Sequence, residues 1–177
     1  PVIFKPIGNN NTGFVTHYIG TYPNGEATQT LLFPDHFIDY WDSVTPGNVS
    51  KWRPNQNTSS QSNSGTFRFN TKGSVDYVSS NLDFYWHTLL WGNTQGYPQW
   101  LPGLSEASTK EAFDNWCSTI ANKYPQIKGI NVLNEPYPSQ SGTSMLKAQL
   151  GGAGVTGHDW IIYVFERAKH YCKIIKR

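Results

Sequence analysis

A ten-residue run, residues 127–136, constrains the fold more than any other part of this sequence. It reads IKGINVLNEP, an apolar stretch that changes abruptly to an amide, a carboxylate and a proline. A short apolar run of this kind is typical of a buried parallel strand. Proline has no N–H to donate to a sheet, so the strand is expected to end before Pro136. Asn134 and Glu135 are therefore predicted to lie at the carboxyl end of a strand, where α/β barrels carry their chemistry.

Three other segments are expected to contain strands: residues 2–8, part of the region 41–52, and residues 82–91. Residues 9–29 and 139–157 are interpreted as long loops, because the first is rich in Asn, Thr and Gly and the second in Gly and Ser. Strand and helix then alternate about four times along the chain. Repeated βα units with buried strands predict a parallel sheet.

Two helices are predicted from their first residues. The patterns Ser108-x-x-Glu111 and Thr156-x-x-Asp159 have the spacing of a capping box, in which the first and fourth residues cap each other's backbone. Apolar residues follow each pattern at helical spacing. We therefore expect the two helices to begin at these capping boxes.

The composition excludes some classes of function. Charged residues make up 15% of the 177 residues, the formal net charge is +2, and no basic run suggests a nucleic-acid partner. No stretch approaches the length of a membrane span. Aromatic residues also make up 15%, with seven tryptophans and ten tyrosines. Most of these rings are expected in the core, and some are expected to line a sugar cleft, because the C–H faces of a sugar ring pack well on indole.

The cysteines and histidines predict neither a disulfide framework nor a metal site. Cys117 and Cys172 are the only cysteines, and both fall on the apolar face of a predicted helix. Buried free thiols are the favoured interpretation, and a bridge between neighbouring helices is the alternative. No histidine has a partner at zinc-ligand spacing, so neither a metal nor another cofactor is expected.

Secretion is expected, and the lack of a signal peptide in the sequence does not oppose it, because a mature extracellular chain would have lost its own. Glycosylation sequons at Asn10, Asn48 and Asn57 are weak signals, because such short patterns arise by chance.

Three segments carry the candidate chemistry: residues 44–52 (VTPGNVSKW), residues 86–100 beginning WHTLLWGN, and the Asn134-Glu135 pair. Asn48 and Lys51 have the donors and acceptors that sugar hydroxyls need, although a solvated turn is the alternative. His87, taken alone, is also consistent with a hydrogen-bonded core histidine. An Asn-Glu pair is common as a helix cap or at a surface, but its place at the end of an apolar strand favours a functional site.

Together these segments resemble the family 10 glycoside hydrolases, which are β-1,4-xylanases built on a TIM barrel. The family's three strand-end patterns occur in the same order and with similar spacing. The matching residues are Thr45, Pro46, Asn48, Lys51 and Trp52 in the first pattern, His87, Thr88, Leu89, Trp91, Pro98 and Trp100 in the second, and Val132, Asn134 and Glu135 in the third. The resemblance implies an α/β fold, a (β/α)8 TIM barrel of which this chain, as a single domain over residues 1–177, supplies roughly the first four βα units.

The resemblance also implies roles for the matched residues. Glu135 is the expected general acid/base, which protonates the leaving oxygen and later activates water. Asn134 is expected to bind the 2-hydroxyl of the sugar next to the scissile bond.

The remaining matched residues are expected to bind substrate. Asn48 and Lys51 would hold the next xylose, His87 the sugar at the cleavage point, and Trp91 would form part of the sugar platform. Gln95 is the best match to the family's glutamine.

Four departures from the family pattern stand out. Gly47 occupies a position where the family usually has glutamate, and Gly92 one where many members have a second histidine. Residues 94–97 lengthen the loop that contains the family's glutamine. Asn131 replaces the usual aspartate.

The second catalytic carboxylate is missing from the pattern. A retaining glycosidase needs a nucleophilic carboxylate about 5 Å from the acid/base. No acidic residue of this sequence other than Glu135 follows an apolar strand in the required way. The nucleophile is therefore expected outside this sequence, on the C-terminal half of the barrel, in the same polypeptide or in a second chain.

We thus expect the N-terminal half of a retaining endo-β-1,4-xylanase that acts on xylan or xylo-oligosaccharides. The alternatives are a non-catalytic xylan-binding protein on a degenerate barrel and a related β-1,4-glucanase.

Overall fold

The computed structural model of the chain describes residues 12–15, 43–46, 50–56 and 83–172. These residues form strands, α-helices and one short 3-10 helix, in a strand-then-helix order. The elements are β1 (Thr12–Val15), β2 (Ser43–Pro46), α2 (Trp52–Gln56), β3 (Asp83–Trp91), η1 (Leu101–Gly103), α4 (Glu106–Lys123), β4 (Gly129–Asn134), α5 (Thr143–Gln149) and α6 (Asp159–Tyr171).

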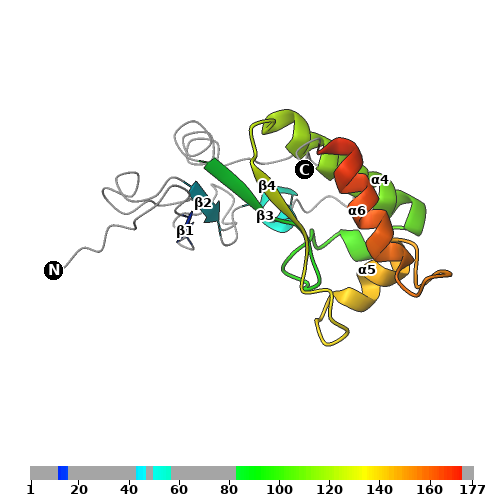
Figure 1. Ribbon diagram of the computed structural model, residues 1–177. Coiled ribbons are helices and arrows are strands. Elements are labelled where there is room, and N and C mark those ends of the chain that lie inside the picture. Colours follow the sequence, from blue (N-terminus) through cyan, green and yellow to red (C-terminus); the bar gives the residue numbers. More distant parts are fainter. Residues whose placement is uncertain (1–11, 16–42, 47–49, 57–82, 173–177) are drawn as a thin grey trace.

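The strands form one parallel sheet in the order β1-β2-β3-β4, so each strand lies beside the next one in the sequence (Figure 1). In β3 and β4 the register pairs Trp91 with Asn134, the last residue of each strand. It shifts between His87 and Leu90, where β3 is irregular. Because all strands are parallel, their carboxyl ends meet at one edge of the sheet, and this edge carries the candidate site.

The helices cover one face of β3 and β4 (Figure 1). Phe84 and Trp86 are buried, whereas Tyr85, between them, is exposed, as the two-residue period of a strand requires. The Trp86 ring packs on Trp116 and Tyr124 of the α4 segment, with ring centroids 6.1 and 5.3 Å away. Large aromatic side chains thus fill the layer between the sheet and α4.

Helices α4 and α6 are joined by a two-pronged ion pair. Arg167 donates from Nε and Nη2 to the two carboxylate oxygens of Asp114, at 2.6 and 2.8 Å. Such a bidentate pair fixes orientation as well as distance. Arg167 Nη2 also donates to the Tyr171 hydroxyl at 3.1 Å. The ion pair between Arg167 and Asp114 helps to set how the two long helices lie against each other.

The strands predicted at residues 82–91 and 127–135 are confirmed as β3 and β4, and β2 lies in the predicted region 41–52. The expectation of one loop over residues 9–29 is wrong at β1, a four-residue strand that pairs with β2. The strand expected at residues 2–8 lies outside the described residues. The loop expected over residues 139–157 is also interrupted, by α5. There Leu146 is completely buried, so packing against the core stabilises a helix in a Gly-rich segment.

Both predicted long helices exist, but neither begins where its capping box was predicted. Helix α4 is capped by Ser105, whose side chain accepts the N–H of Ser108, so Ser108 already lies in the first turn. Helix α6 begins at Asp159, because Gly157 has φ +80° and cannot belong to a helix. The Asp159 carboxylate still accepts the N–H of Thr156 at 3.1 Å, which is half of the predicted capping box.

The cysteines and tryptophans mostly serve the core. Cys117 and Cys172 are buried and free, as favoured from the sequence. Five of the described tryptophans are buried, namely Trp52, Trp86, Trp100, Trp116 and Trp160. Trp91 differs from them, since it is only half-buried at the carboxyl end of β3. In the described part of the chain, no helix has the length and apolar character needed to cross a membrane.

Candidate active site

The carboxyl ends of β2, β3 and β4 bring Lys51, Trp91 and Glu135 together. Lys51 follows β2, Trp91 is the last residue of β3, and Glu135 directly follows β4. The indole Nε1–H of Trp91 donates to Glu135 Oε2 at 2.7 Å, a bond to a candidate catalytic carboxylate. The Lys51 ammonium lies 3.8 Å from the centroid of the Trp91 ring, within the range of a cation–π contact. One indole thus links the ammonium and the carboxylate.

Glu135 has an unusual backbone conformation. Its φ is +47°, in the left-handed region that residues with a side chain rarely adopt. Strained residues of this kind are enriched at active sites, where the surrounding structure holds them in place. The sequence pattern of a strand ended by proline did not reveal this turn.

Gly92 is part of what holds this turn. Its N–H donates to the Asn134 carbonyl at 3.0 Å, and a Cβ at position 92 would lie only 2.2 Å from the Glu135 carbonyl oxygen. The same Cβ would lie 2.5 Å from Oγ1 of Thr143, at the start of α5. The departure from the family pattern at position 92 therefore has a structural reason, because the backbone after β4 occupies the space of a side chain.

A second donor to Glu135 was missed in the sequence. Gln140 Nε2 donates to Glu135 Oε2 at 2.7 Å, from the loop between β4 and α5. Gln95, the glutamine predicted from the family pattern, is exposed, and its N–H turns back to Asn93 Oδ1 at 2.9 Å. Gln140 is therefore the glutamine that contacts the candidate acid/base. Its only sequence signal is its position five residues after Glu135.

Lys51 and His87 are both shifted toward their neutral forms. Lys51 is 6% exposed, and burial lowers its pKa from 10.5 to about 8, against the opposing effect of the Glu135 carboxylate. Burial also lowers the pKa of His87, and the nearby Lys51 charge lowers it further, while Glu135 raises it. His87 is thus mainly a neutral imidazole at pH 7, able to donate from one nitrogen and accept at the other. Its carbonyl accepts the Ser50 hydroxyl, which ties β3 to the segment after β2.

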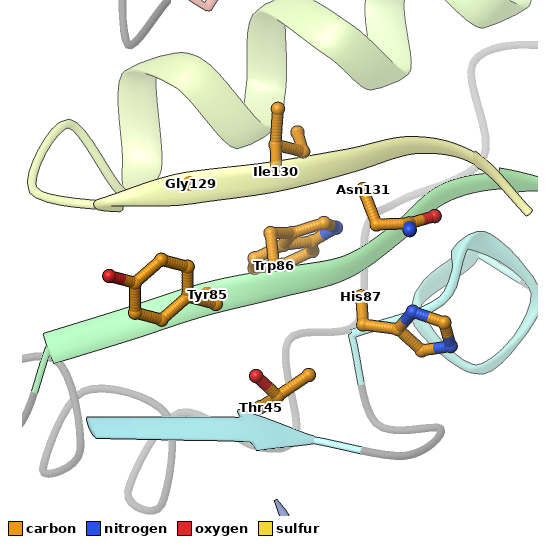
Figure 2. Close-up of a pocket in the computed structure, with 7 residues that line it drawn as sticks. All are labelled: Thr45, Tyr85, Trp86, His87, Gly129, Ile130 and Asn131. Carbon is orange, nitrogen blue, oxygen red and sulfur yellow. The ribbon is translucent and has the colours of Figure 1, made fainter. Parts of the chain in front are cut away.

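A hollow of about 480 Å³ lies on the face of the sheet opposite the helices. Figure 2 shows Thr45 of β2, Tyr85 and His87 of β3, and Asn131 of β4 around it. Tyr85 lies against Gly129, where a Cβ would be 2.8 Å from the tyrosine ring. Asn131 is level with His87 in the register, and its carbonyl accepts the Thr88 hydroxyl at 2.6 Å. The hollow extends from His87 toward the amino ends of the strands.

The other predicted site residues have different outcomes. Asn134 is half-buried at the end of β4, beside Glu135, as predicted. Asn48 lies outside the described residues. The other described carboxylates lie on α4 and α6 or at the start of β3, and none of them directly follows a strand: Asp83, Glu106, Glu111, Asp114, Asp159 and Glu166. Within the described ranges, no group of three or more His, Cys, Asp or Glu could hold a metal ion.

Sequence and structure comparisons find xylanases. The chain is 27% identical over 153 residues to endo-1,4-beta-xylanase B of Cellvibrio japonicus (strain Ueda107), which covers 84% of this chain and 23% of that protein. It superposes on native xylanase 10C of Cellvibrio japonicus with a TM-score of 0.70 and 20% identity, covering 96% of this chain and 36% of the other. A family 10 structure from Paenibacillus barcinonensis gives a TM-score of 0.65 at 19% identity, over 92% and 48% of the two chains.

These similarities identify the architecture. The four parallel strands and their helices are part of a (β/α)8 barrel, as predicted. The chain spans about a quarter to a half of the length of the relatives named above. Residues 12–176 match the sequence pattern described as glycosyl hydrolase family 10. The chain therefore belongs to glycosyl hydrolase family 10.

Proposed function

We propose that this chain is part of a retaining endo-β-1,4-xylanase in which Glu135 is the general acid/base. The observation that carries the proposal is the position of the Glu135 carboxylate, at the carboxyl end of β4 and hydrogen-bonded to the Trp91 indole at 2.7 Å. Family membership and the xylanase relatives support it, and a structure of a xylanase 10C variant similar to this chain contains xylopentaose.

The proposed reaction has two displacements. In the first, a carboxylate nucleophile forms a bond to the anomeric carbon while the bond from that carbon to the glycosidic oxygen breaks, and Glu135 gives its proton to the leaving oxygen. In the second, Glu135 takes a proton from water as the water oxygen attacks the anomeric carbon and the nucleophile leaves. We place the nucleophile outside this sequence, on the remaining strands of the barrel, in the same polypeptide or in a second chain.

The neighbouring groups suit a neutral sugar. Trp91 presents an aromatic face, Lys51 three donors, and the Asn134 amide both a donor and acceptors. His87, mainly neutral at pH 7, adds one donor and one acceptor without a charge. We propose that these four residues bind the sugars on either side of the scissile bond, and Asn48 and Gln95 remain predicted members of the same site.

The direct test replaces the acid/base and keeps its shape. In the intact protein, Glu135→Gln is expected to lower xylan hydrolysis, followed as new reducing ends, by about 100-fold or more, since general acid–base catalysis typically contributes that much. Binding of xylo-oligosaccharides, measured by calorimetry, should change little. The matched control is Glu166→Gln, the same change at an exposed position on α6.

Two outcomes would point to the alternatives. A wild-type protein that binds xylo-oligosaccharides but releases no reducing ends would be a xylan-binding protein rather than an enzyme. A protein that cleaves soluble cellulose faster than xylan would be a glucanase, since its site would have to accommodate the hydroxymethyl group of glucose.

We also propose that the protein acts outside the cell, where its polymeric substrate would be found. The intact protein should accumulate in the culture medium of its source, and retention in the cell pellet would contradict this.

A further inference from the structure

The loop after β3 and the loop after β4 form a clasp beside Glu135. The clasp consists of residues 92–97 and residues 137–143, which are far apart in the sequence. Its hydrogen bonds run from Gly142 N to Gly92 O at 2.8 Å, from Asn93 Nδ2 to Gln140 Oε1 at 3.1 Å, and from Thr94 N to Ser141 Oγ at 3.2 Å. The lengthened segment 94–97 therefore has a definite place, packed on the loop that follows the acid/base.

Gln140 connects this clasp to the candidate acid/base. Its side-chain oxygen accepts from Asn93, and its Nε2 donates to Glu135 Oε2 at 2.7 Å. Its own backbone is fixed by a turn, because the Gln140 N–H donates to the Tyr137 carbonyl at 2.9 Å. Both ends of the side-chain amide are thus engaged, which leaves the carboxamide little freedom to rotate.

The donors to Glu135 converge on one oxygen. Trp91 Nε1 and Gln140 Nε2 both reach Oε2, each at 2.7 Å, and in the described part of the chain no donor reaches Oε1. An oxygen that accepts two hydrogen bonds is a poor place for a proton, because a proton there would compete with both donors. The proton of the acid form therefore belongs on Oε1.

We propose that Gln140 is a positioning residue for proton transfer: with Trp91 it holds Oε2 as an acceptor, so that Oε1 carries the proton to the leaving oxygen. This inference rests on the proposed function of Glu135. Asn93 completes the arrangement by fixing the orientation of the Gln140 amide, which presents its nitrogen rather than its oxygen to the carboxylate.

The test uses the dependence of the reaction on its leaving group. Protonation matters when the leaving group is a sugar hydroxyl and matters little when it is an activated phenol. In the intact protein, Gln140→Leu keeps approximate size and removes the donor. We expect kcat/KM for xylotetraose to fall about 10- to 100-fold, since a hydrogen bond to a charged group and a small misplacement of a catalytic group have effects of this order. For dinitrophenyl β-xylobioside the loss should stay below about 3-fold.

A matched control and a second variant complete the design. Gln149→Leu makes the same change on α5, where Gln149 bonds Thr109 and Pro102 instead of Glu135, and should leave both substrates unaffected. Asn93→Ala frees the Gln140 amide to turn and should give the same selective loss, at a smaller size. It also keeps the proposal testable if Gln140→Leu does not fold.

The outcomes separate this inference from the proposed function. Equal losses on both substrates would mean that Gln140 only supports the fold, and unchanged rates would mean that it does not position Glu135. Either result would overturn the inference while leaving a xylanase with Glu135 as its acid/base. If the wild-type protein cleaves neither substrate, the proposed function itself is wrong.

Discussion

Lys51 is expected to strengthen substrate binding but to lower the stability of the folded protein. Burial lowers its pKa from 10.5 to about 8, so at pH 7 the folded protein holds a charge where the charge is disfavoured. At about 1.4 kcal/mol per pKa unit this corresponds to a cost of about 3 kcal/mol. The cation–π contact with Trp91 offsets part of this cost, typically about 0.5–2 kcal/mol. Lys51→Met should therefore raise the free energy of unfolding by about 1–3 kcal/mol at pH 7.

The stability difference between Lys51→Met and the wild type should also depend on pH. Between pH 8 and 10.5 the unfolded chain binds more protons at Lys51 than the folded chain does, so the stability of the wild type rises with pH in this window. The advantage of Lys51→Met should accordingly shrink by about 2 kcal/mol between pH 7 and about pH 9.5. Below about pH 7 Lys51 is protonated in both the folded and the unfolded chain, so the advantage should level off there.

The assay is urea unfolding of the intact protein at these two pH values, with initial rates on xylan. The control is Lys147→Met, the same change at an exposed position on α5. Lys51→Met should be more stable yet show a raised KM. A variant less stable than the wild type at pH 7, or an advantage that is the same at both pH values, would refute this reasoning.

Two further predictions concern the packing of the chain. Gly92→Ala places a Cβ 2.2 Å from the backbone carbonyl oxygen of Glu135, the candidate acid/base. It should lower the free energy of unfolding by about 1–3 kcal/mol and reduce xylan turnover more than sugar binding. Unchanged turnover would contradict the close approach of the two backbones. Burial raises the pKa of Cys117 well above its usual value and that of Cys172 to about 11, so iodoacetamide at pH 8 should modify neither thiol until the protein is unfolded. Mass spectrometry checks this, and labelling of the folded protein within minutes would show that the thiols are accessible.

The sequence predicted those parts of the fold that depend on local patterns. The apolar runs of β3 and β4 are long enough to be recognised, and α4 shows the helical spacing of Ala112, Phe113, Trp116 and Cys117, all of which are buried. Helix α5 was missed because its segment is rich in Gly and Ser. The spacing of Leu146 and Leu150, both buried, was its main apolar signal.

The residues of the candidate site likewise divide into those that local sequence patterns predict and those that depend on tertiary contacts. Glu135 was predicted from its place directly after an apolar strand, whereas Lys51 and Trp91 were predicted from their match to the family pattern. Gln140 was not, because its contact depends on a loop whose path is set by the Asn93 side chain 47 residues away. The left-handed conformation of Glu135 could not be predicted either, since it follows from tertiary contacts rather than from the residue itself.

The claim that Glu135 is the acid/base of a retaining enzyme is tested most directly by removing its carboxyl group and restoring the reaction with an added nucleophile. In the intact protein, Glu135→Ala should still form the glycosyl–enzyme intermediate from dinitrophenyl β-xylobioside but should hydrolyse it slowly, because no base activates water. Azide needs no base, so adding it should raise the steady-state rate and yield xylobiosyl azide of β configuration, as two inversions require. A rate unaffected by azide, with no azide product, would contradict this role of Glu135.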